Sequence, residues 1–303
     1  MLQTTLKVSE ISIEDKQYFD KYFEMANLQV SELNFTNFYI WRDYYKVRYS
    51  IINNFLCIMS TMEDKKPFCF FPIGDYDNSE DLKTAIFAIK EYFFEQGWEF
   101  LFCRVSAQQI YVLEGLDIKF NAKEDRDNFD YIYSVQKLST LSGKKLDGKR
   151  NHINKFKKLH TFEYIEISDE TISDCIDIVE KWCVQRNYSQ NSSLIAERKA
   201  NLDLLNNYNS LGVTGAIIKV DGKPEAFTVG EKLNSDTVVI HVEKANSEIQ
   251  GLYSLVNQQF LANHWKDVEY VNREQDLGLE GLRKAKLSYN PIQLIEKFIV
   301  ELC

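Results

Sequence analysis

A charged segment near the C-terminus is the first place in this sequence where side chains could carry out chemistry. Residues 272–291 read NREQDLGLEGLRKAKLSYNP, with seven full charges and two glycines. The segment follows a short β-rich run at 268–271, and open α/β sheets bind ligands at the carboxyl ends of their strands. Glutamate can accept a proton, tyrosine can donate one, and arginine or lysine can stabilise an anion. The functional interpretation makes Glu274 a base, Tyr289 an acid, Arg273 and Lys286 anion stabilisers, and Asn272 a ligand-binding residue.

An ordinary structural role for the same segment stays open. Asp276 would then cap a helix, while Arg283 and Lys284 would lie in solvent. Glu243, directly after the β-branched run at 237–242, is a second candidate base.

A second segment concentrates positive charge. Residues 144–158 hold seven Lys and Arg and one acid, in a chain of net charge −9. This contrast favours one localised anion site over general binding to nucleic acid. Gly143 and Gly148 would let the backbone approach a phosphate-bearing ligand. The alternative is a solvated helix between two halves of the chain, which would bury Ile153, Phe156 and Leu159. The ligand-binding candidates here are Lys144, Lys145, Lys149, Arg150, His152 and Asn154.

Composition excludes several classes of protein. The length of 303 residues is enough for about two domains, and 45% hydrophobic residues can form sizeable cores. The sequence contains no run of about 18 apolar residues and no signal-peptide pattern at its start. Its cysteines form no CxxC pair, and its four histidines show no ligand spacing with them, so no metal site is expected. A reducing cytoplasm is the expected compartment.

The order of predicted elements is the same in both halves of the chain. In the C-terminal half, strands at 214–220, 226–232 and 237–242 precede a helix from Ile249 to Phe260, a strand at 268–271, a helix at 281–286 and a strand at 294–300. Upstream, a helix at 169–186 would be capped by Asp169. The N-terminal half gives helices at 13–25 and 31–40, strands at 46–50, 55–61 and 68–72, a helix at 81–95, a strand at 99–105, a helix at 107–113, and strands near Ile118 and Tyr131.

This order predicts a structural duplication. An antiparallel meander followed by a helix-linked strand pair is the order of the GNAT acyltransferase fold. We therefore expect an α+β or α/β protein of two tandem GNAT-like domains, each a mixed central sheet flanked by helices. The expected domains are residues 1–142 and residues 143–303, the second beginning with the basic segment.

The start of the 249–260 helix corresponds to the point where GNAT enzymes hold a pyrophosphate. Backbone N–H groups at a helix start suit that role. Of the usual Arg/Gln-x-x-Gly-x-Gly/Ala signature only Gly251 is present, so Gly251 is a ligand-binding candidate and an ordinary helix start is the favoured alternative.

The two charged segments resemble those of the phosphatidylglycerol lysyltransferase C-terminal domain family. The resemblance rests on Gly143, Lys144, Lys145, Gly148 and the block 149–154 (KRNHIN), and on residues 272–286 with Ser288, Tyr289 and Pro291. It extends over almost the whole chain and implies a tandem GNAT fold similar to Fem-type aminoacyltransferases. Such relatives transfer an amino acid from aminoacyl-tRNA to an amine or a lipid hydroxyl.

Two functions follow as alternatives. The first is an aminoacyl or acyl transferase acting at a site between the halves, with aminoacyl-tRNA or acyl-CoA as donor, an amine or hydroxyl as acceptor, and no firm cofactor. The second is a non-catalytic module that binds tRNA or another phosphorylated ligand. Peripheral contact with a membrane and the oligomeric state stay open. A third hypothesis is a degenerate domain that is retained for protein interaction.

Overall fold

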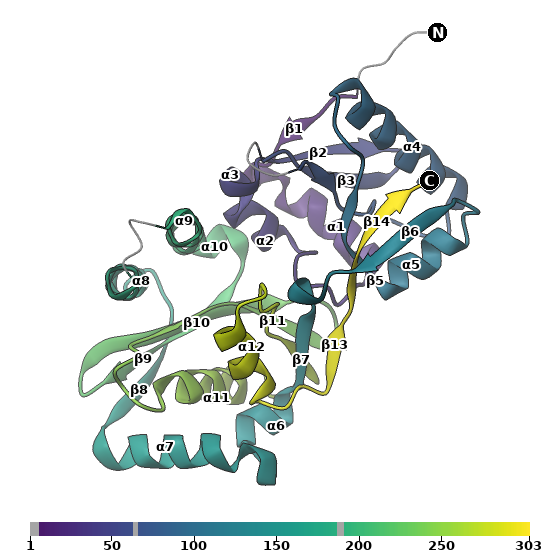
Figure 1. The fold of residues 1–303 in the computed structure, drawn as a ribbon. Coiled ribbons are helices and arrows are strands. Elements are labelled where there is room, and N and C mark those ends of the chain that lie inside the picture. Colours follow the sequence, from purple (N-terminus) through teal and green to yellow (C-terminus); the bar gives the residue numbers. More distant parts are fainter. Residues whose placement is uncertain (1–5, 63–65, 187–190) are drawn as a thin grey trace. The chain divides into compact units, whose positions relative to one another are not determined.

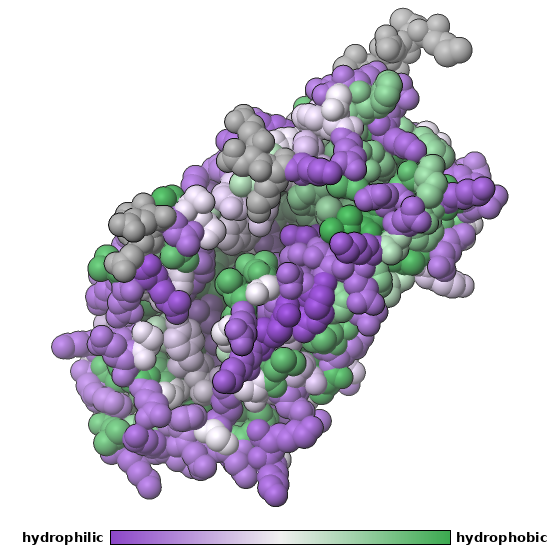
Figure 2. All heavy atoms as spheres, viewed as in Figure 1, coloured by the Kyte–Doolittle hydropathy of each residue, from purple (hydrophilic) through white to green (hydrophobic). Residues whose placement is uncertain are grey.

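The computed structural model describes residues 6–62, 66–186 and 191–303. The chain forms two compact units, one comprising Met1–Phe129 with Ile295–Cys303 and the other Asp130–Leu294. We call them unit 1 and unit 2. Each contains a seven-stranded mixed sheet flanked by helices (Figure 1). Most side chains on the face drawn in Figure 2 are hydrophilic, and apolar ones are exposed in separate areas.

The sheet of unit 1 has the strand order β1-β2-β3-β4-β5-β14-β6. The β4–β5 pair is parallel and the other neighbouring strands are antiparallel. Helix α4 buries residues spaced as one helical face: Leu82, Ala85, Ile86, Ile89 and Phe93. The strands are β1 (Ser9–Glu10), β2 (Val47–Ile52), β3 (Phe55–Ser60), β4 (Phe68–Cys69), β5 (Phe102–Ser106), β14 (Lys297–Leu302) and β6 (Phe120–Glu124); the helices are α1 (Lys16–Ala26), α2 (Phe35–Ile40), α3 (Arg42–Tyr45), α4 (Ser79–Glu95) and α5 (Ala107–Glu114), with 3-10 turns η1 (Ile13–Asp15) and η2 (Arg126–Asn128).

The sheet of unit 2 has the order β13-β7-β12-β11-β10-β9-β8. Helices α7 and α11 lie on one face of it and α8 and α9 on the other (Figure 1). The strands are β7 (Asp130–Ser134), β8 (Phe162–Glu166), β9 (Thr214–Val220), β10 (Lys223–Lys232), β11 (Thr237–Ala245), β12 (Tyr270–Asn272) and β13 (Gln293–Ile295); the helices are α6 (Val135–Thr140), α7 (Asp147–Leu159), α8 (Ile172–Gln185), α9 (Ser192–Asn206), α10 (Tyr208–Leu211), α11 (Leu252–His264) and α12 (Glu280–Leu287), with the 3-10 turn η3 (Lys144–Leu146).

The core of unit 2 follows from side-chain alternation. Ala216, Ile218 and Val220 occupy every second position of β9 and lie in one apolar cluster with the buried face of α11. The β9–β10 hairpin turns at Asp221 and Gly222, which both have positive φ, as the Asp-Gly pair predicts. The strands and helices predicted between residues 169 and 286 are all present, within a few residues of their predicted ends. The prediction of two mixed sheets flanked by helices is confirmed.

The compact units divide the chain at different points from the expected boundary between residues 142 and 143. Strand β7 pairs with β12 of unit 2, and β14 pairs with β5 and β6 of unit 1. The strand predicted over 294–300 is two strands, β13 and β14, in different sheets. Sequence order cannot show this, because any strand can pair with whichever edge its connection reaches. The two sheets share a pattern. When the strands are counted from β1 in unit 1 and from β8 in unit 2, the sixth strand is β14 in unit 1 and β7 in unit 2.

Three local predictions were wrong. Asp169 does not cap α8, because the helix begins after Thr171 and the Asp169 carboxylate accepts a hydrogen bond from Asn209. Leu159 at the end of α7 is 66% exposed, while Ile153 and Phe156 are buried as expected. Helix α12 begins after Leu279, so Asp276 is not its capping residue.

All six cysteines are free thiols. No helix in the described ranges 6–62, 66–186 and 191–303 is long and apolar enough to cross a bilayer. Over the same ranges, no cluster of His, Cys, Asp and Glu side chains has the size of a metal site.

Candidate functional site

The candidate site of unit 2 lies where two parallel strands separate. Strands β11 and β12 are paired over three residues, ending at Val239 and Asn272. Beyond that point the backbone of Arg273 and Glu274 bonds to Tyr131 of β7 instead: Arg273 N–H donates to the Tyr131 carbonyl (3.0 Å), and Tyr131 N–H donates to the Glu274 carbonyl (3.3 Å). Strand β11 continues without β12 beside it, so side chains on its last residues face those of the 273–276 loop.

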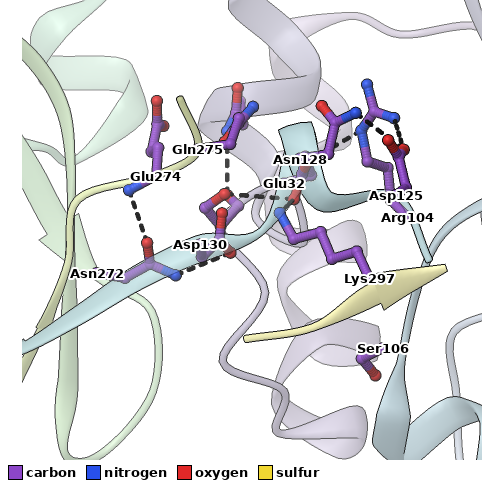
Figure 3. Close-up of polar contacts among 12 residues, drawn as sticks. Glu32, Arg104, Ser106, Asp125, Asn128, Asp130, Asn272, Glu274, Gln275 and Lys297 are labelled. Atoms are coloured by element: carbon purple, nitrogen blue, oxygen red, sulfur yellow. Dashed lines mark hydrogen bonds and ion pairs between the residues drawn. The ribbon is translucent and has the colours of Figure 1, made fainter. Parts of the chain in front are cut away.

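Buried side chains fix the course of this loop. The side-chain Nδ2 of Asn272 donates to Asp130 Oδ2 (3.0 Å), and its side-chain Oδ1 accepts from the Glu274 N–H (2.7 Å), as Figure 3 shows. Both Asn272 and Asp130 are completely buried. Glu274 has a φ of 56°, in the left-handed region that non-glycine residues seldom adopt. Asn272, predicted to bind a ligand, here holds the backbone that carries Glu274.

Arg273 and Glu243 form an ion pair in this gap. Arg273 Nη2 lies 2.9 and 3.1 Å from the two carboxylate oxygens of Glu243, which also accepts from Asn257 Nδ2 (3.0 Å). The guanidinium lies over the rings of Tyr289 (4.7 Å) and Tyr133 (5.8 Å). Burial opposes its charge, but Glu243 together with Tyr289 and Tyr133 outweighs burial and raises the pKa of Arg273. Nη1 is buried and has no hydrogen-bond partner among the described residues.

His241 lies between two carboxylates in the same region. Its Nε2 is 2.9 Å from Glu231 Oε1, and its Nδ1 is 3.5 Å from Glu274 Oε1. The imidazole is 1% exposed and the Glu274 side chain is 25% exposed. Burial disfavours the imidazolium, but the two carboxylates prevail and raise the pKa of His241 to about 9. The His241 imidazole is therefore a cation at neutral pH. It lies between Glu231, which is largely buried, and Glu274, which is the more accessible of the two carboxylates.

A β-bulge places His241 there. Across β10 and β11, Val229 pairs with Val242 and Gly230 with Ile240, so His241 is an extra residue without a partner. Bulges turn a side chain away from the regular alternation and are common beside active sites. A glycine is required at position 230 because the backbones of β10 and β11 come close together there. An added Cβ would lie 2.4 Å from the Val239 carbonyl oxygen.

Tyr289 connects this group to the basic segment. Its hydroxyl is 3.1 Å from Ser254 Oγ, and Lys149 Nζ lies 3.9 Å from the centre of its ring. Burial raises the pKa of Tyr289, which keeps the phenol protonated. Burial and then repulsion by Arg273 lower the pKa of Lys149. Of the six predicted ligand-binding residues of the basic segment, Lys149 is the one that the structure brings to Tyr289 and Arg273.

Lys286 and Asp276 fasten the loop. The Lys286 ammonium donates to the carbonyls of Arg273, Glu274 (3.0 Å) and Gln275 (2.7 Å), which uses its three donors. Burial lowers the pKa of Lys286 to about 8. Asp276 is completely buried. Burial opposes its ionisation, but hydrogen bonds from Arg283 and from Tyr131 outweigh burial and lower its pKa to about 2. In this arrangement Lys286 acts on the backbone.

The other basic candidates lie around helix α7. Arg150 donates to the Leu141 and Gly143 carbonyls and pairs with Asp147, so it closes the turn before α7. Lys145 Nζ is 3.0 Å from Asn290 Oδ1, and His152 Nδ1 is 3.2 Å from Gln250 Nε2. The side chains of Lys144, Lys145, His152 and Asn154 are exposed.

Gly251 lets α7 lie directly against the start of α11. It has a φ of 94°, and an added Cβ would be 2.6 Å from the His152 carbonyl oxygen. Gln250 also accepts a hydrogen bond from Lys155 Nζ (2.9 Å). The start of α11 is thus in contact with helix α7.

A separate cluster of charges lies in unit 1 and is also drawn in Figure 3. Lys297, the first residue of β14, is completely buried and pairs with Glu32. Arg104 bridges Glu32 (3.2 Å) and Asp125 (3.0 Å), and Asn128 donates to Asp125 (2.8 Å). A buried charge without its partner is costly, so this cluster anchors β14 in the sheet of unit 1.

Sequence reasoning missed several members of the site. Glu231, His241, Tyr133, Ser254 and Asn257 were not candidates. One signal was available, since a histidine inside the apolar strand sequence VVIHV is unusual. The contacts of the other four depend on the register of β10 and β11 and on the packing of α11.

The shared sheet order and the parallel pair that separates define a tandem GNAT-like protein. Residues 23–301 match the family described as "Phosphatidylglycerol lysyltransferase, C-terminal". The chain belongs to this family.

Known structures show the same fold. A conserved protein of unknown function from Bacteroides thetaiotaomicron VPI-5482 is 34% identical, with a TM-score of 0.90 over 98% of this chain and 100% of that one. L-PGS from Bacillus licheniformis has a TM-score of 0.63 at 14% identity over 95% and 91% of the chains. A tandem GNAT protein from the clavulanic acid biosynthesis pathway has a TM-score of 0.52 at 6% identity over 98% of each chain. The last two are similar in fold alone.

One curated relative also matches. The uncharacterized protein MYCGA3080 from Mycoplasmoides gallisepticum is 27% identical over an alignment of 215 residues, and the match covers 64% of this chain and 65% of that protein. The match therefore spans just under two thirds of the relative's length.

Proposed function

We propose that unit 2 carries the site of an aminoacyl or acyl transferase, which moves an activated acyl group to an amine or hydroxyl. The observation that carries the proposal is the buried Arg273 guanidinium. Glu243 holds its Nη2, while Nη1 has no hydrogen-bond partner among the described residues. A buried unpaired donor costs about 1–3 kcal/mol. A carbonyl oxygen that gains negative charge during acyl transfer would supply the missing acceptor.

Of the two candidate bases, the contacts favour Glu274. Both oxygens of Glu243 accept from Arg273, so Glu243 serves as the counter-ion that positions the guanidinium. Glu274 is a quarter exposed, and its carboxylate is oriented by His241. We infer that Glu274 accepts the nucleophile's proton and that His241, backed by Glu231, positions Glu274.

With these roles the reaction is an ordinary acyl transfer. The nucleophile's nitrogen or oxygen attacks the carbonyl carbon of the donor and gives its proton to Glu274. The oxygen of the tetrahedral intermediate carries the negative charge beside Arg273. As the intermediate collapses, the bond to the donor's leaving oxygen or sulfur breaks, and that atom takes a proton. The Tyr289 hydroxyl, protonated at neutral pH, is our candidate for this proton donor.

Aminoacyl-tRNA is the donor that we propose, with acyl-CoA as the alternative. The exposed cations Lys144 and Lys145, with exposed His152, could contact the phosphates of a nucleic acid. The start of α11, where GNAT enzymes hold a pyrophosphate, is in contact with α7 at Gly251, which argues against that mode of binding CoA. We place the reaction in the cytoplasm, where tRNA is charged and free cysteines stay reduced.

A transfer assay tests the proposal. Purified protein is mixed with tRNA charged with labelled amino acids, or with a panel of acyl-CoA donors, and offered phosphatidylglycerol and small amines as acceptors. We expect Glu274→Gln to lower the rate about 10²–10⁴-fold, the usual effect of losing a general base. The matched control Glu170→Gln changes an exposed acid elsewhere in unit 2 and should leave the rate unchanged.

Folding and binding are measured beside turnover. Circular dichroism and thermal melting must show that both variants are folded. Turnover that is equal in wild type and Glu274→Gln would refute the assigned role of Glu274. Absence of turnover with every donor, together with tRNA binding that weakens steeply with salt, would favour the non-catalytic binding module instead.

A further inference from the structure

Helix α4 of unit 1 carries two phenylalanines in solvent. Phe87 is 50% exposed and Phe94 is 79% exposed. They are seven residues apart, and each residue of an α-helix turns by about 100°, so their directions around the helix differ by only about 20°. The buried face of α4, which packs into the core of unit 1, points away from both: Leu82, Ala85, Ile86, Ile89 and Phe93. The two rings therefore form one stripe along the solvent side of the helix.

Opposite charges flank this stripe. Lys90 and Glu91 lie between the two phenylalanines, and the helical turn places them about 50° to opposite sides of the line that joins the rings. We call Phe87, Lys90, Glu91 and Phe94 the α4 stripe. Glu91 is exposed and Lys90 is partly exposed.

Helix α4 itself offers neither of these charges an opposite charge. Side chains pair along a helix at three or four positions. At those distances Lys90 has isoleucine and phenylalanines, while Glu91 has alanine, phenylalanines and a glutamate. One turn earlier the situation differs, because Lys83 is 3.4 Å from Glu80 of the same helix.

The stripe is complementary to itself under one kind of symmetry. If a two-fold axis runs parallel to α4, two copies of the helix lie side by side in the same direction, and each phenylalanine meets its own counterpart. The lysine side of one helix then faces the glutamate side of the other, so Lys90 contacts the partner's Glu91 twice in the dimer. An antiparallel pair would instead bring Lys90 toward the partner's Lys90.

From this pattern we propose that the chain forms a two-fold symmetric dimer through the α4 stripe, with the two α4 helices parallel. A second copy satisfies both parts of the surface, since it covers the rings and supplies an opposite charge to Lys90 and to Glu91. An anionic bilayer would be repelled by the exposed acids Glu80, Glu91 and Glu95 of this helix. A basic peptide would leave Lys90 without a counter-ion.

The expected dimer is weak. Helix α4 has 17 residues, so one helix pair is about 25 Å long and lies at the low end of specific interfaces in area. We expect a dissociation constant between about 1 and 100 µM. Sedimentation equilibrium of the full-length protein, from about 1 to 200 µM, measures it.

A first variant tests the rings. Phe87→Gln with Phe94→Gln removes four rings from the dimer and should raise the dissociation constant at least about tenfold. Both side chains are exposed and glutamine is a good helix former, so the monomer should stay folded, as circular dichroism will show. The control Leu159→Gln removes a side chain of similar exposure (66%) from α7 in unit 2 and should dimerise like wild type.

Charge exchange tests the parallel arrangement. Lys90→Glu alone, or Glu91→Lys alone, makes both charge contacts of the dimer repulsive and should raise the dissociation constant about tenfold. An equal mixture of these two variants should associate again. One copy then carries two acids and the other two cations at these positions, so both contacts are attractive. The combined variant Lys90→Glu with Glu91→Lys should dimerise like wild type for the same reason.

Three results would overturn the proposal. One is a folded wild type that stays monomeric up to about 200 µM, far above the expected dissociation constant; if it also bound lipid vesicles through the two phenylalanines, the stripe would belong to a bilayer. Another is a dimer that the phenylalanine variant and Leu159→Gln affect equally. The last is a mixture of the two charge variants that associates no better than either alone. None of these measurements involves acyl transfer, so they stand apart from the test of the proposed reaction.

Discussion

The histidine between Glu231 and Glu274 gives a prediction that combines stability and pH. Replacing it, as His241→Asn, removes the one cation shared by the two carboxylates while leaving a small polar side chain on the bulge. Glu231 and Glu274 then face each other across a buried neutral group. We expect the variant to be less stable than wild type at neutral pH. It should also lack the part of the pH dependence of stability that comes from deprotonation of His241.

The magnitude follows from the pKa of His241. Its value of about 9 in the folded protein stands against 6.5 for a free histidine. One pKa unit is worth about 1.4 kcal/mol, so the charged form contributes about 3 kcal/mol. Because the folded pKa is the higher one, this stabilisation is fully present below pH 6.5. It is lost progressively as pH rises from 6.5 through about 9.

The assay is urea unfolding at pH 6 and at pH 9.5. Trp41 and Trp98 are replaced by Phe, so that the buried Trp182 and Trp265 report on unit 2. Between these pH values, wild type should lose about 3 kcal/mol more unfolding free energy than His241→Asn. The control His160→Asn, which removes a partly exposed imidazole paired with Asp221, should show the wild-type loss.

Parallel pH profiles for wild type and His241→Asn would refute the reasoning. They would mean that His241 is neutral in the folded protein or that its charge contributes nothing. A transfer rate unaffected by the variant would separately remove His241 from its positioning role. The two results are independent, because one is measured without substrate.

The remaining predictions concern the supports of the site. Glu243→Gln leaves the buried Arg273 guanidinium without its counter-ion and should cost about 3–5 kcal/mol in urea unfolding. Gly251→Ala places a Cβ against the His152 carbonyl at a positive φ and should lower the unfolding free energy by about 1–3 kcal/mol, seen as a lower melting temperature. Asp276→Asn should destabilise at neutral pH. Because the pKa of Asp276 is held at about 2, below its ordinary 3.8, wild type should lose this advantage between about pH 5 and pH 2, as unfolding at successive pH values will show.

The sequence by itself determined many of the elements of this protein and pointed to two segments in which charged residues are concentrated. Alternating apolar residues in β9 and the Asp-Gly turn after it specify a hairpin by local physics, and the face of α11 is fixed by its 3.6-residue period. These signals do not depend on the rest of the chain. Arg273, Glu274 and Tyr289 became candidates because seven charges in twenty residues after a strand are costly unless they are solvated or used.

Only the tertiary structure decided which strand joins which sheet and which side chains meet. Strand β7 precedes the expected boundary and pairs with β12, and β14 closes the sheet of unit 1. The partners of His241 come from β10 and from the loop after β12, and a single extra residue in β11 determines that its imidazole lies between them. Register is a property of two strands together, since a shift of one residue turns every side chain to the other face. A sequence read along one strand therefore identifies the histidine but cannot show what it contacts.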